Sequence, residues 1–423
     1  MTQNNRHGGQ TIALVCALDT KGEEARLVRD YIVARGRRVL AIDTGIVGEP
    51  AFESNVSASE VAKAAGTSLE ELRRAGDRGA AIAAMAAGAA VVAGRLHAEG
   101  RLDGIVGLGG SAGTAVGSAA MRALPVGVPK VLVSTVASGN VAPYVGTKDI
   151  ALMYSVVDVS GINRLSRAVL TNAAGAICGA VEAAAELAAQ PAKEEKPLLA
   201  ASMFGNTTKL VDAARAQLEA RGYEVLVFHA TGSGGQTMEG LIRDGFFQGV
   251  LDVTTTEWAD QLCGGVFDAG PTRLDAAGER GIPQVIAPGC LDMVNFGGEE
   301  TIPAKYREDK SRKFYVWNPQ VTLMRTTPEE NAQLGKILAE KANAAKGPVQ
   351  IFLPLRGVSI LDSVTDEGPQ LFWWPEADKA LFDAIKANVR QGIPVHDLEV
   401  NVNDPQFAAA TAGALLEMVG SKK

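Results

Sequence analysis

Short apolar runs alternate with stretches of helical periodicity along the whole chain. The run TIALVCAL at 11–18 predicts a strand, the following GEEARLVRDYIVARG predicts a helix that ends at Gly36, and RVLAID at 38–43 predicts the next strand. The apolar runs at 104–110 and 130–135 continue the series. Strands that alternate with helices are typical of a parallel sheet covered by helices, so we expect an α/β fold.

The second half of the chain repeats the pattern of the first. The segment YIVARGRRVLAIDTG at 31–45 is similar to QLEARGYEVLVFHATG at 217–232, and DGIVGL with the later GVPKVLVST is similar to QGVLDV with the later GIPQVIAPG. Two further strand and helix pairs follow residue 347 and are expected to complete the second sheet. Such similarity indicates an internal duplication, although any two Rossmann-like units share this periodicity.

A charged segment, KEEKP at 193–197, separates the two halves and predicts a boundary near residue 195. We therefore expect two Rossmann-like lobes, each a mainly parallel sheet flanked by helices, with a cleft between them. In this interpretation residues 1–195 form a nucleotide-binding lobe and residues 196–423 form the substrate side. Ligands of such sheets bind where the strands end, so the turns after the strands hold the candidate residues.

The amino-acid composition and the net charge exclude some classes of binding partner. The 423 residues are 47% hydrophobic and 21% charged, and 41 basic against 48 acidic side chains give a net charge of −7, which argues against nucleic acid or an anionic membrane as the main partner. The uncharged stretch at 79–94 is too short for a membrane span and predicts a buried helix. Four widely spaced cysteines and an N-terminus without a hydrophobic signal region favour a cytoplasmic protein.

The motif GLGGSAGT at 107–114 follows a predicted strand and opens a predicted helix. Backbone N–H groups at such a helix N-terminus, left uncovered by side chains, can bind phosphate. The motif is neither a Walker A loop nor a strict GxGxxG, and the alternative is a tight turn without a ligand. The expected anion-binding residues are Gly109, Gly110, Ser111, Gly113 and Thr114.

The segment VSTVASGNVAPYVGTKDI at 133–150 follows the next strand and is rich in hydroxyl groups and glycine. If the two strands are neighbours, Thr135, Ser138 and Gly139 are expected beside the glycine turn. Asp149 is a candidate for holding Mg²⁺ through water, because phosphate-bound magnesium needs only one or two carboxylates. A solvated loop with a turn aspartate is the alternative.

The motif DTKG begins at residue 19, after the first strand. Asp19 is expected to cap the first helix or, with Thr20 and Lys21, to contact the nucleotide. Lysines in such a turn often bind phosphate, although many are simply solvated.

In the second half, FHATGSGGQTME at 228–239 places His229 at a strand end, three glycines in an open turn, and Glu239 in the next helix. This pattern predicts an acid/base pair beside a second anion site, with a purely structural histidine as the alternative. A further set of polar residues also follows strands and could converge with Arg325 on the same cleft: Asp252, Glu257, Asp260 and Asp292. We expect a functional role for Arg325.

Taken together, these motifs resemble the ATP-binding family that includes the N-terminal domain of a tomato tobamovirus-resistance protein. The resemblance extends from about residue 11 to residue 418 and is carried by LGGSAGT, PKVLVSTVASGNVAPYVGTKDI, MFGNTT, VFHATGSGGQTMEGLI, VLDVTTTEWAD and TLMRTTPEE. It implies a two-lobed α/β fold, binding of ATP with Mg²⁺, and a homodimer.

The expected function is that of an ATP-binding protein, with an ATP/Mg-dependent enzyme acting on a small metabolite as the leading hypothesis. A transferase, ligase or hydrolase would fit. The alternative is a nucleotide-sensing or partner-binding dimer without turnover. A dehydrogenase fits less well because GxGxxG is missing, although Asp43 ends the second strand where a ribose-binding acid would lie.

Overall fold

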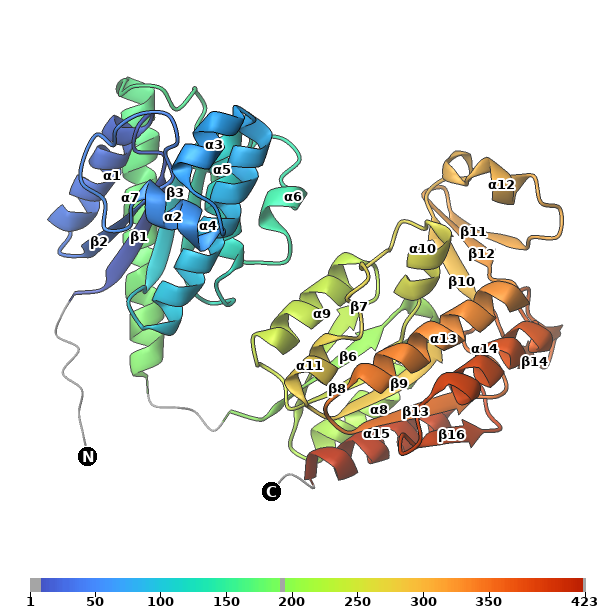
Figure 1. Cartoon of the computed structure of the whole chain (residues 1–423). Helices are drawn as coiled ribbons and strands as arrows, with labels where there is room; N and C mark the ends of the chain where they lie inside the picture. Colours follow the sequence, from blue (N-terminus) through green and yellow to red (C-terminus); the bar gives the residue numbers. More distant parts are fainter. Residues whose placement is uncertain (1–8, 191–194, 421–423) are drawn as a thin grey trace. The chain divides into compact units, whose positions relative to one another are not determined.

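The structure is a computed structural model that describes residues 9–190 and 195–420. The chain divides into two compact units, residues 1–192 and 193–423, which we call the N-terminal and the C-terminal unit (Figure 1). The charged segment predicts the boundary at residue 195. The cleft expected between the lobes stays a prediction.

The N-terminal unit is built on one parallel sheet with the strand order β2-β1-β3-β4-β5. Its strands are β1 (Thr11–Cys16), β2 (Arg38–Asp43), β3 (Gly104–Gly109), β4 (Lys130–Ser134) and β5 (Ala151–Tyr154). Its helices are α1 (Gly22–Ala34), α2 (Ala58–Ala64), α3 (Leu69–Ala75), α4 (Arg78–Ala98), α5 (Ser111–Arg122), α6 (Ala142–Val145) and α7 (Arg164–Ala189).

Alternate residues of the central strand β1 bury their side chains on opposite faces of this sheet. Ile12 and Leu14 pack with α1 and α7, whereas Ala13 and Val15 pack with α2, α4 and α5 (Figure 1). Both faces are therefore covered, which explains why the strands are apolar along their whole length.

Helices α4 and α7 are long and apolar enough to cross a membrane by length and composition. In the structure each buries one side in the core of the N-terminal unit, α4 through Met85, Val92 and Leu96, and α7 through Leu170 and Ile177. The helix expected at 79–94 is thus confirmed as part of α4, although only one of its sides is buried.

The C-terminal unit has a six-stranded parallel sheet in the order β16-β13-β9-β8-β6-β7. These strands are β6 (Leu198–Met203), β7 (Glu224–His229), β8 (Gly249–Thr254), β9 (Gln284–Gly289), β13 (Val349–Pro354) and β16 (Val395–Leu398). A separate antiparallel sheet, β10-β12-β11, is formed by β10 (Met293–Phe296), β11 (Phe314–Asn318) and β12 (Val321–Arg325). A two-residue ribbon pairs β14 (Val364–Thr365) with β15 (Gly368–Pro369).

Helices cover both faces of the six-stranded sheet. The helices and 3₁₀ turns of this unit are η1 (Gly205–Thr207), α8 (Thr208–Ala220), α9 (Ser233–Arg243), α10 (Glu257–Cys263), α11 (Ala276–Arg280), η2 (Glu299–Thr301), α12 (Ala304–Arg307), α13 (Pro328–Ala344), α14 (Pro375–Asn388) and α15 (Pro405–Gly420). Helices α8 and α15 pack on one face, and α9, α11, α13 and α14 pack on the other (Figure 1).

The two units share a strand order. Read from its other edge, the second sheet runs β7-β6-β8-β9-β13, which matches β2-β1-β3-β4-β5 strand for strand. The similar segments expected from the sequence therefore occupy equivalent strands, and the two pairs after residue 347 complete the second sheet as β13 and β16. In each sheet the order reverses beside the first strand, and ligands of doubly wound sheets bind at this reversal point.

Candidate functional site

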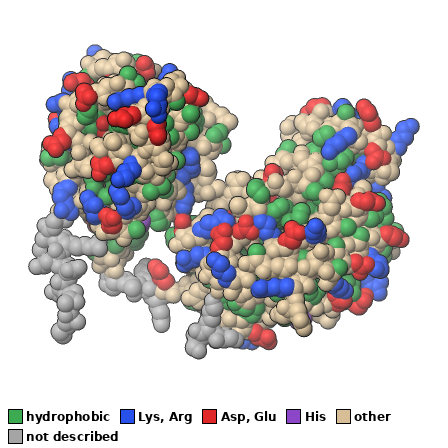
Figure 2. Space-filling view, in the orientation of Figure 1, with side chains coloured by type: hydrophobic (Ala, Val, Ile, Leu, Met, Phe, Trp, Pro, Cys, Tyr) green, Lys and Arg blue, Asp and Glu red, His purple; other side chains and the backbone are tan. Residues whose placement is uncertain are grey.

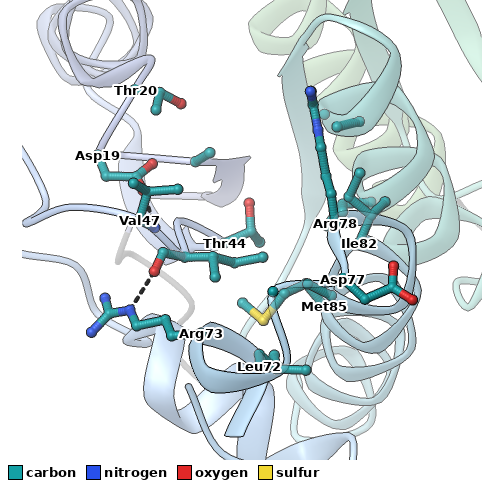
Figure 3. Close-up of a pocket in the computed structure, with 17 residues that line it drawn as sticks. Asp19, Thr20, Thr44, Val47, Leu72, Arg73, Asp77, Arg78, Ile82 and Met85 are labelled. Carbon is teal, nitrogen blue, oxygen red and sulfur yellow. Dashed lines mark hydrogen bonds between the residues drawn. The ribbon is translucent and has the colours of Figure 1, made fainter. Parts of the chain in front are cut away.

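The N-terminal unit has a cavity of about 570 Å³ at the carboxyl ends of β1 and β2 (Figure 3). Its walls come from the turns after these strands, from α3, and from the first turns of α4 and α5. Its lining includes Ala17, Asp19, Thr20, Thr44, Ile46, Val47, Leu72, Arg73, Asp77, Arg78, Ile82, Met85, Ala112, Gly113 and Val116.

This first cavity has an apolar floor and polar walls. Leu72 and Met85 lie at its base, while Thr20 and Arg78 lie on opposite sides of it (Figure 3). Arg73 is turned away, because its Nε donates to the carbonyl of Ile46. The arrangement suits a flat apolar group with polar substituents at one end.

A second cavity of about 270 Å³ lies over the glycine turn that follows β3. It is lined by Lys21 and Asp158 together with the turn itself, residues 108–113. The two cavities have five lining residues in common and are therefore two parts of one hollow. The shared residues are Ala17, Thr20, Arg78, Ala112 and Gly113. The hollow lies at the reversal point between β1 and β3.

The glycine turn leaves the N-terminus of α5 uncovered. Gly110 is the N-cap residue and provides no side-chain cap, so the N–H groups of the first turn of this 12-residue helix face the second cavity. Gly109 has φ 156° and lies so close to Gly113 that a side chain at position 109 would collide with its backbone. At Gly110, in contrast, the nearest atom to an added Cβ is Thr135 Oγ1 at 3.9 Å.

Thr114 does not face the cavity. It is buried, and its hydroxyl bonds to the carbonyl of Gly110 and to Ser134 Oγ at 2.7 Å, so it ties β4 to the glycine turn. Thr135 lies beside the turn as expected, with its N–H 3.4 Å from the Gly109 carbonyl. Ser138 and Gly139 are exposed residues of the next turn and do not line either cavity.

Asp19 holds the loop after β2 and does not cap the first helix. Its Oδ2 accepts from the N–H groups of Val47 and Gly48 at 2.8 and 3.1 Å, and the N-cap position of α1 belongs to Lys21. Asp19 Oδ1 is buried without a hydrogen-bond partner among the described residues.

The Asp43 side chain has a structural role. It is buried, and its Oδ1 accepts from the N–H groups of Leu18 and Gly45. Burial raises the pKa of this carboxyl group. The ribose-binding acid of a dehydrogenase would need an accessible carboxylate here, so this geometry argues against that alternative.

Asp149 lies at the amino ends of the strands, whereas the glycine turn lies at their carboxyl ends. Its carboxylate pairs with Lys130 Nζ at 2.7 Å and accepts from the N–H of Gly127, at the amino end of β4. Parallel strands place their amino ends far from their carboxyl ends, so the expected role of Asp149 in holding a phosphate-bound Mg²⁺ is not supported. The exposed carboxylate that does line the second cavity is that of Asp158, after β5.

The glycine turn of the C-terminal unit, at 232–235, is already filled. Glu257 Oε1 accepts from the N–H groups of Gly232 and Gly235 at 2.9 and 3.1 Å, at the N-terminus of α9. A side chain at position 235 would collide with the same carboxylate. The second anion site expected here is therefore occupied by the protein's own Glu257.

Glu239 belongs to a buried ionic cluster. Its carboxylate accepts from the N–H groups of Leu274 and Ala276 at 2.7 and 2.8 Å, and lies 3.3 Å from Arg273 Nη1. Arg273 also pairs with Asp252 and Glu257, and is itself fully buried. Burial raises the pKa of Glu239, and the charge of Arg273 opposes that rise. This geometry does not support Glu239 as a catalytic acid or base beside His229.

Arg325 is also buried. It donates to the Phe372 carbonyl at 2.8 Å and to Asp378 at 2.6 Å, with Asp362 3.7 Å away, so it does not reach a cavity surface. Asp260 is buried too and accepts from Asn295 at 2.7 Å. The acidic side chains that were expected to converge with Arg325 form internal networks instead and do not meet at an open site. They are Asp252, Glu257, Asp260 and Asp292.

His229 alone among the three expected catalytic residues is exposed. It ends β7 and lines a third cavity, of about 210 Å³, within the C-terminal unit. Two charged residues that line the second cavity, Arg78 and Asp158, were not predicted from the sequence. Arg78 opens α4 behind a short helix, and Asp158 follows an irregular turn, so neither stands beside a recognisable motif.

The visible face of each unit does not favour binding of a polyanion. Basic and acidic side chains are interspersed on the visible face of each unit (Figure 2).

Among residues 9–190 and 195–420, no group of three or more His, Cys, Asp or Glu side chains is placed to hold a metal ion.

Comparison with known proteins places both units in one family. Residues 10–186 match the N-terminal domain, and residues 196–419 the C-terminal domain, of the uncharacterised protein family UPF0261. A UPF0261 protein from Clostridium tetani is 51% identical over 96% of this chain and 98% of its own length. The ToMV resistance protein Tm-1(GCR237) of Solanum lycopersicum is 44% identical over 81% of this chain, which corresponds to 45% of that protein.

Solved structures add little. UDP-N-acetylglucosamine 2-epimerase from Rickettsia bellii aligns with 98% of this chain and 96% of its own, at 9% identity and a TM-score of 0.21. Glycosyltransferase VinC in complex with dTDP aligns with 97% of this chain and 100% of its own, at 9% identity and a TM-score of 0.19. Similarity at this level supports no inference about function.

Proposed function

The chain belongs to the uncharacterised protein family UPF0261, and from the geometry of its N-terminal unit we propose that it binds ATP together with Mg²⁺. The observation that carries this proposal is the continuous hollow at the reversal point of the sheet, with an apolar part and a glycine-lined part. These two parts match the two chemically different ends of a nucleotide.

The adenosine end fits the larger, apolar part. Leu72, Ile82 and Met85 offer a surface for a flat base, and their side chains contribute no charge. Asp19 lines this part of the hollow, although one of its carboxylate oxygens, Oδ1, is buried against the loop after β2. Its other oxygen keeps the loop after β2 in position.

The phosphates fit the glycine-lined part. The uncapped N-terminus of α5 supplies backbone N–H donors and the positive end of the helix dipole. Lys21 and Arg78 add two positive charges to the same cavity wall. A charge-assisted hydrogen bond is about twice as strong as a neutral one, so these two side chains are expected to favour triphosphate over monophosphate.

Magnesium fits the same part of the hollow. Mg²⁺ binds through one or two carboxylates, water and the phosphates themselves, and Asp158 is the carboxylate that lines this cavity, with the hydroxyls of Thr20 and Ser111 nearby in the lining. When bound, the ion would offset the negative charge of the phosphates. Asp158 would hold it in place against the glycine turn.

A second candidate function is ATP-dependent chemistry on a small metabolite, which includes the transferase, ligase and hydrolase types. One observation favours it: His229 is exposed at a cavity of the C-terminal unit. Glu239 and Arg325 are buried and are not part of this proposal. Screening small metabolites for ATP consumption, with His229→Gln as the comparison, separates this function from binding alone.

The proposal is tested by calorimetry on the full chain with ATP and with adenosine. We expect Lys21→Ala and Arg78→Ala each to weaken ATP binding about tenfold, because each removes a charged contact to phosphate worth roughly 1.5 kcal/mol. Adenosine binding should change by less than twofold. Equal losses for both ligands would contradict the placement of the phosphates at the glycine turn.

A further inference from the structure

The third cavity lies wholly within the C-terminal unit and is built by an insertion. It is lined by Phe204, Gly205, Asn206, His229, Phe267, Trp317, Asn318, Val321 and Leu323. The last four belong to the β11–β12 hairpin and its turn, and the antiparallel sheet to which that hairpin belongs has no counterpart in the N-terminal unit among the described residues. The insertion thus closes one side of a cavity at the carboxyl ends of β6 and β7.

The lining is aromatic. Phe204 and Phe267 pack edge to face with ring centroids 6.1 Å apart, and Trp317 of the hairpin also lines the cavity, with 53% of its surface exposed. An exposed tryptophan ring is costly to leave in water, and aromatic side chains bind flat ligands by stacking. A volume of about 210 Å³ has room for a single ring system.

The lining also favours uncharged ligands. Apart from His229, the nine lining residues contain no titratable side chain. The nearby N-terminus of α9, which could otherwise hold an anion, is filled by Glu257. A phosphate or carboxylate would lose its water here without gaining a compensating charge.

One polar group in the wall is poorly satisfied. Asn206 is only 2% exposed, and its amide nitrogen donates to Met293 Sδ at 3.3 Å, although a thioether is a weak acceptor. Its amide oxygen accepts no hydrogen bond from residues 9–190 or 195–420. A carboxamide or lactam on the ligand would offer the donor and acceptor that this side chain lacks.

We propose that this cavity is a second ligand site, which takes an uncharged planar ring bearing a carboxamide or lactam. The ring lies against Phe204, Phe267 and Trp317, and the amide edge meets Asn206. This site is independent of nucleotide binding by the N-terminal unit, so it can be tested in the absence of ATP.

The test uses saturation-transfer NMR on the full chain with three probes of similar size: benzamide, benzoate and cyclohexanecarboxamide. Benzamide should bind most tightly, because benzoate is charged and cyclohexanecarboxamide is not planar. Trp317→Ala should weaken benzamide binding about fivefold or more, as expected for loss of a stacking partner, and Trp317→Phe should preserve most of it.

Phe246→Ala is the matched control, since Phe246 is an exposed ring of the same unit outside the cavity. It should leave benzamide binding unchanged. The proposal is overturned if benzamide does not bind at millimolar concentration, if benzoate binds as tightly as benzamide, or if Phe246→Ala costs as much affinity as Trp317→Ala.

Discussion

Glu257 and Gly110 show how differently two glycine-rich turns can be used. Both turns precede a helix, and both predict an anion site from sequence alone. At α9 the site is filled by the Glu257 carboxylate, which comes from a segment more than twenty residues further along the chain. At α5 no side chain caps the helix, and the cavity remains open. Sequence identified both turns but could not show which one the protein fills itself, because the filling residue is distant in sequence.

Buried carboxylates of the C-terminal unit make its stability depend on pH. Burial raises the pKa of Asp292 to about 7 and that of Asp378 to about 8; the charge of Asp362 adds to both shifts, and Arg325 opposes them. Asp292 Oδ2 accepts from Ser359 Oγ, while Oδ1 has no partner among the described residues. Because the folded pKa exceeds the unfolded value near 3.9, the protonated form stabilises the fold at low pH. This contribution is lost as the pH rises toward 8.

We therefore expect the free energy of unfolding of the C-terminal unit to fall between pH 5 and pH 8, by up to about 1.4 kcal/mol per pH unit for each proton released. All four tryptophans belong to this unit, so their fluorescence during urea unfolding reports on it alone. Asp292→Asn should flatten the pH dependence. A slope as steep in Asp292→Asn as in the wild type would show that Asp292 is not the titrating group.

The edge strand β5 separates two aspartates that the sequence does not distinguish. Asp149 precedes β5 and Asp158 follows it. Asp149 therefore lies at the amino ends of the parallel strands, and Asp158 lies at their carboxyl ends. The sequence predicts Asp149 as the magnesium ligand because it is a carboxylate in the polar segment that follows β4. The β5 strand within that region is short and partly exposed, which left no clear apolar signal to show where the chain crosses the sheet.

If Asp158 holds magnesium, Asp158→Asn should remove most of the gain in ATP affinity that Mg²⁺ provides, while ATP binding without the ion stays the same or improves as a negative charge is removed. Calorimetry with ATP in the presence of Mg²⁺ or of EDTA measures this difference. Asp149→Asn is the control and should keep the full effect of the ion. The reverse result, with the effect lost only in Asp149→Asn, would restore the original assignment.

The whole chain consists of two units with the same strand order, and much of this arrangement was predictable. Apolar runs and helical periodicity identified β1, β2, β6 and β7 and the equivalence between them, because both faces of a parallel sheet need apolar residues. The inserted β10–β12 sheet was not predicted. Its pairing is antiparallel, and the exposed strand β11 lacks a buried face that would give a repeating pattern.

The candidate site was predictable only where the backbone itself forms it. Glycines at 109, 110 and 113 and the lysine at 21 stand in recognisable turns, and the structure places them around one cavity. The apolar floor comes from α3 and α4, whose residues look like ordinary core positions in sequence. Arg325 looked functional because it ends a strand, and Glu239 because it follows a glycine turn in the next helix, but pairing with distant partners buries both.

The most direct test of nucleotide binding by the N-terminal unit is the affinity of Gly110→Val for ATP and Mg²⁺, measured by calorimetry. The backbone at 110 has room for a Cβ, so the fold should persist by circular dichroism while the new side chain obstructs the phosphate cavity. Gly179→Val, on the exposed side of α7 with no atom near the added Cβ, is the control. We predict at least a tenfold loss for Gly110→Val, about 1.4 kcal/mol, and none for Gly179→Val; undiminished affinity in a folded Gly110→Val protein would contradict the proposal.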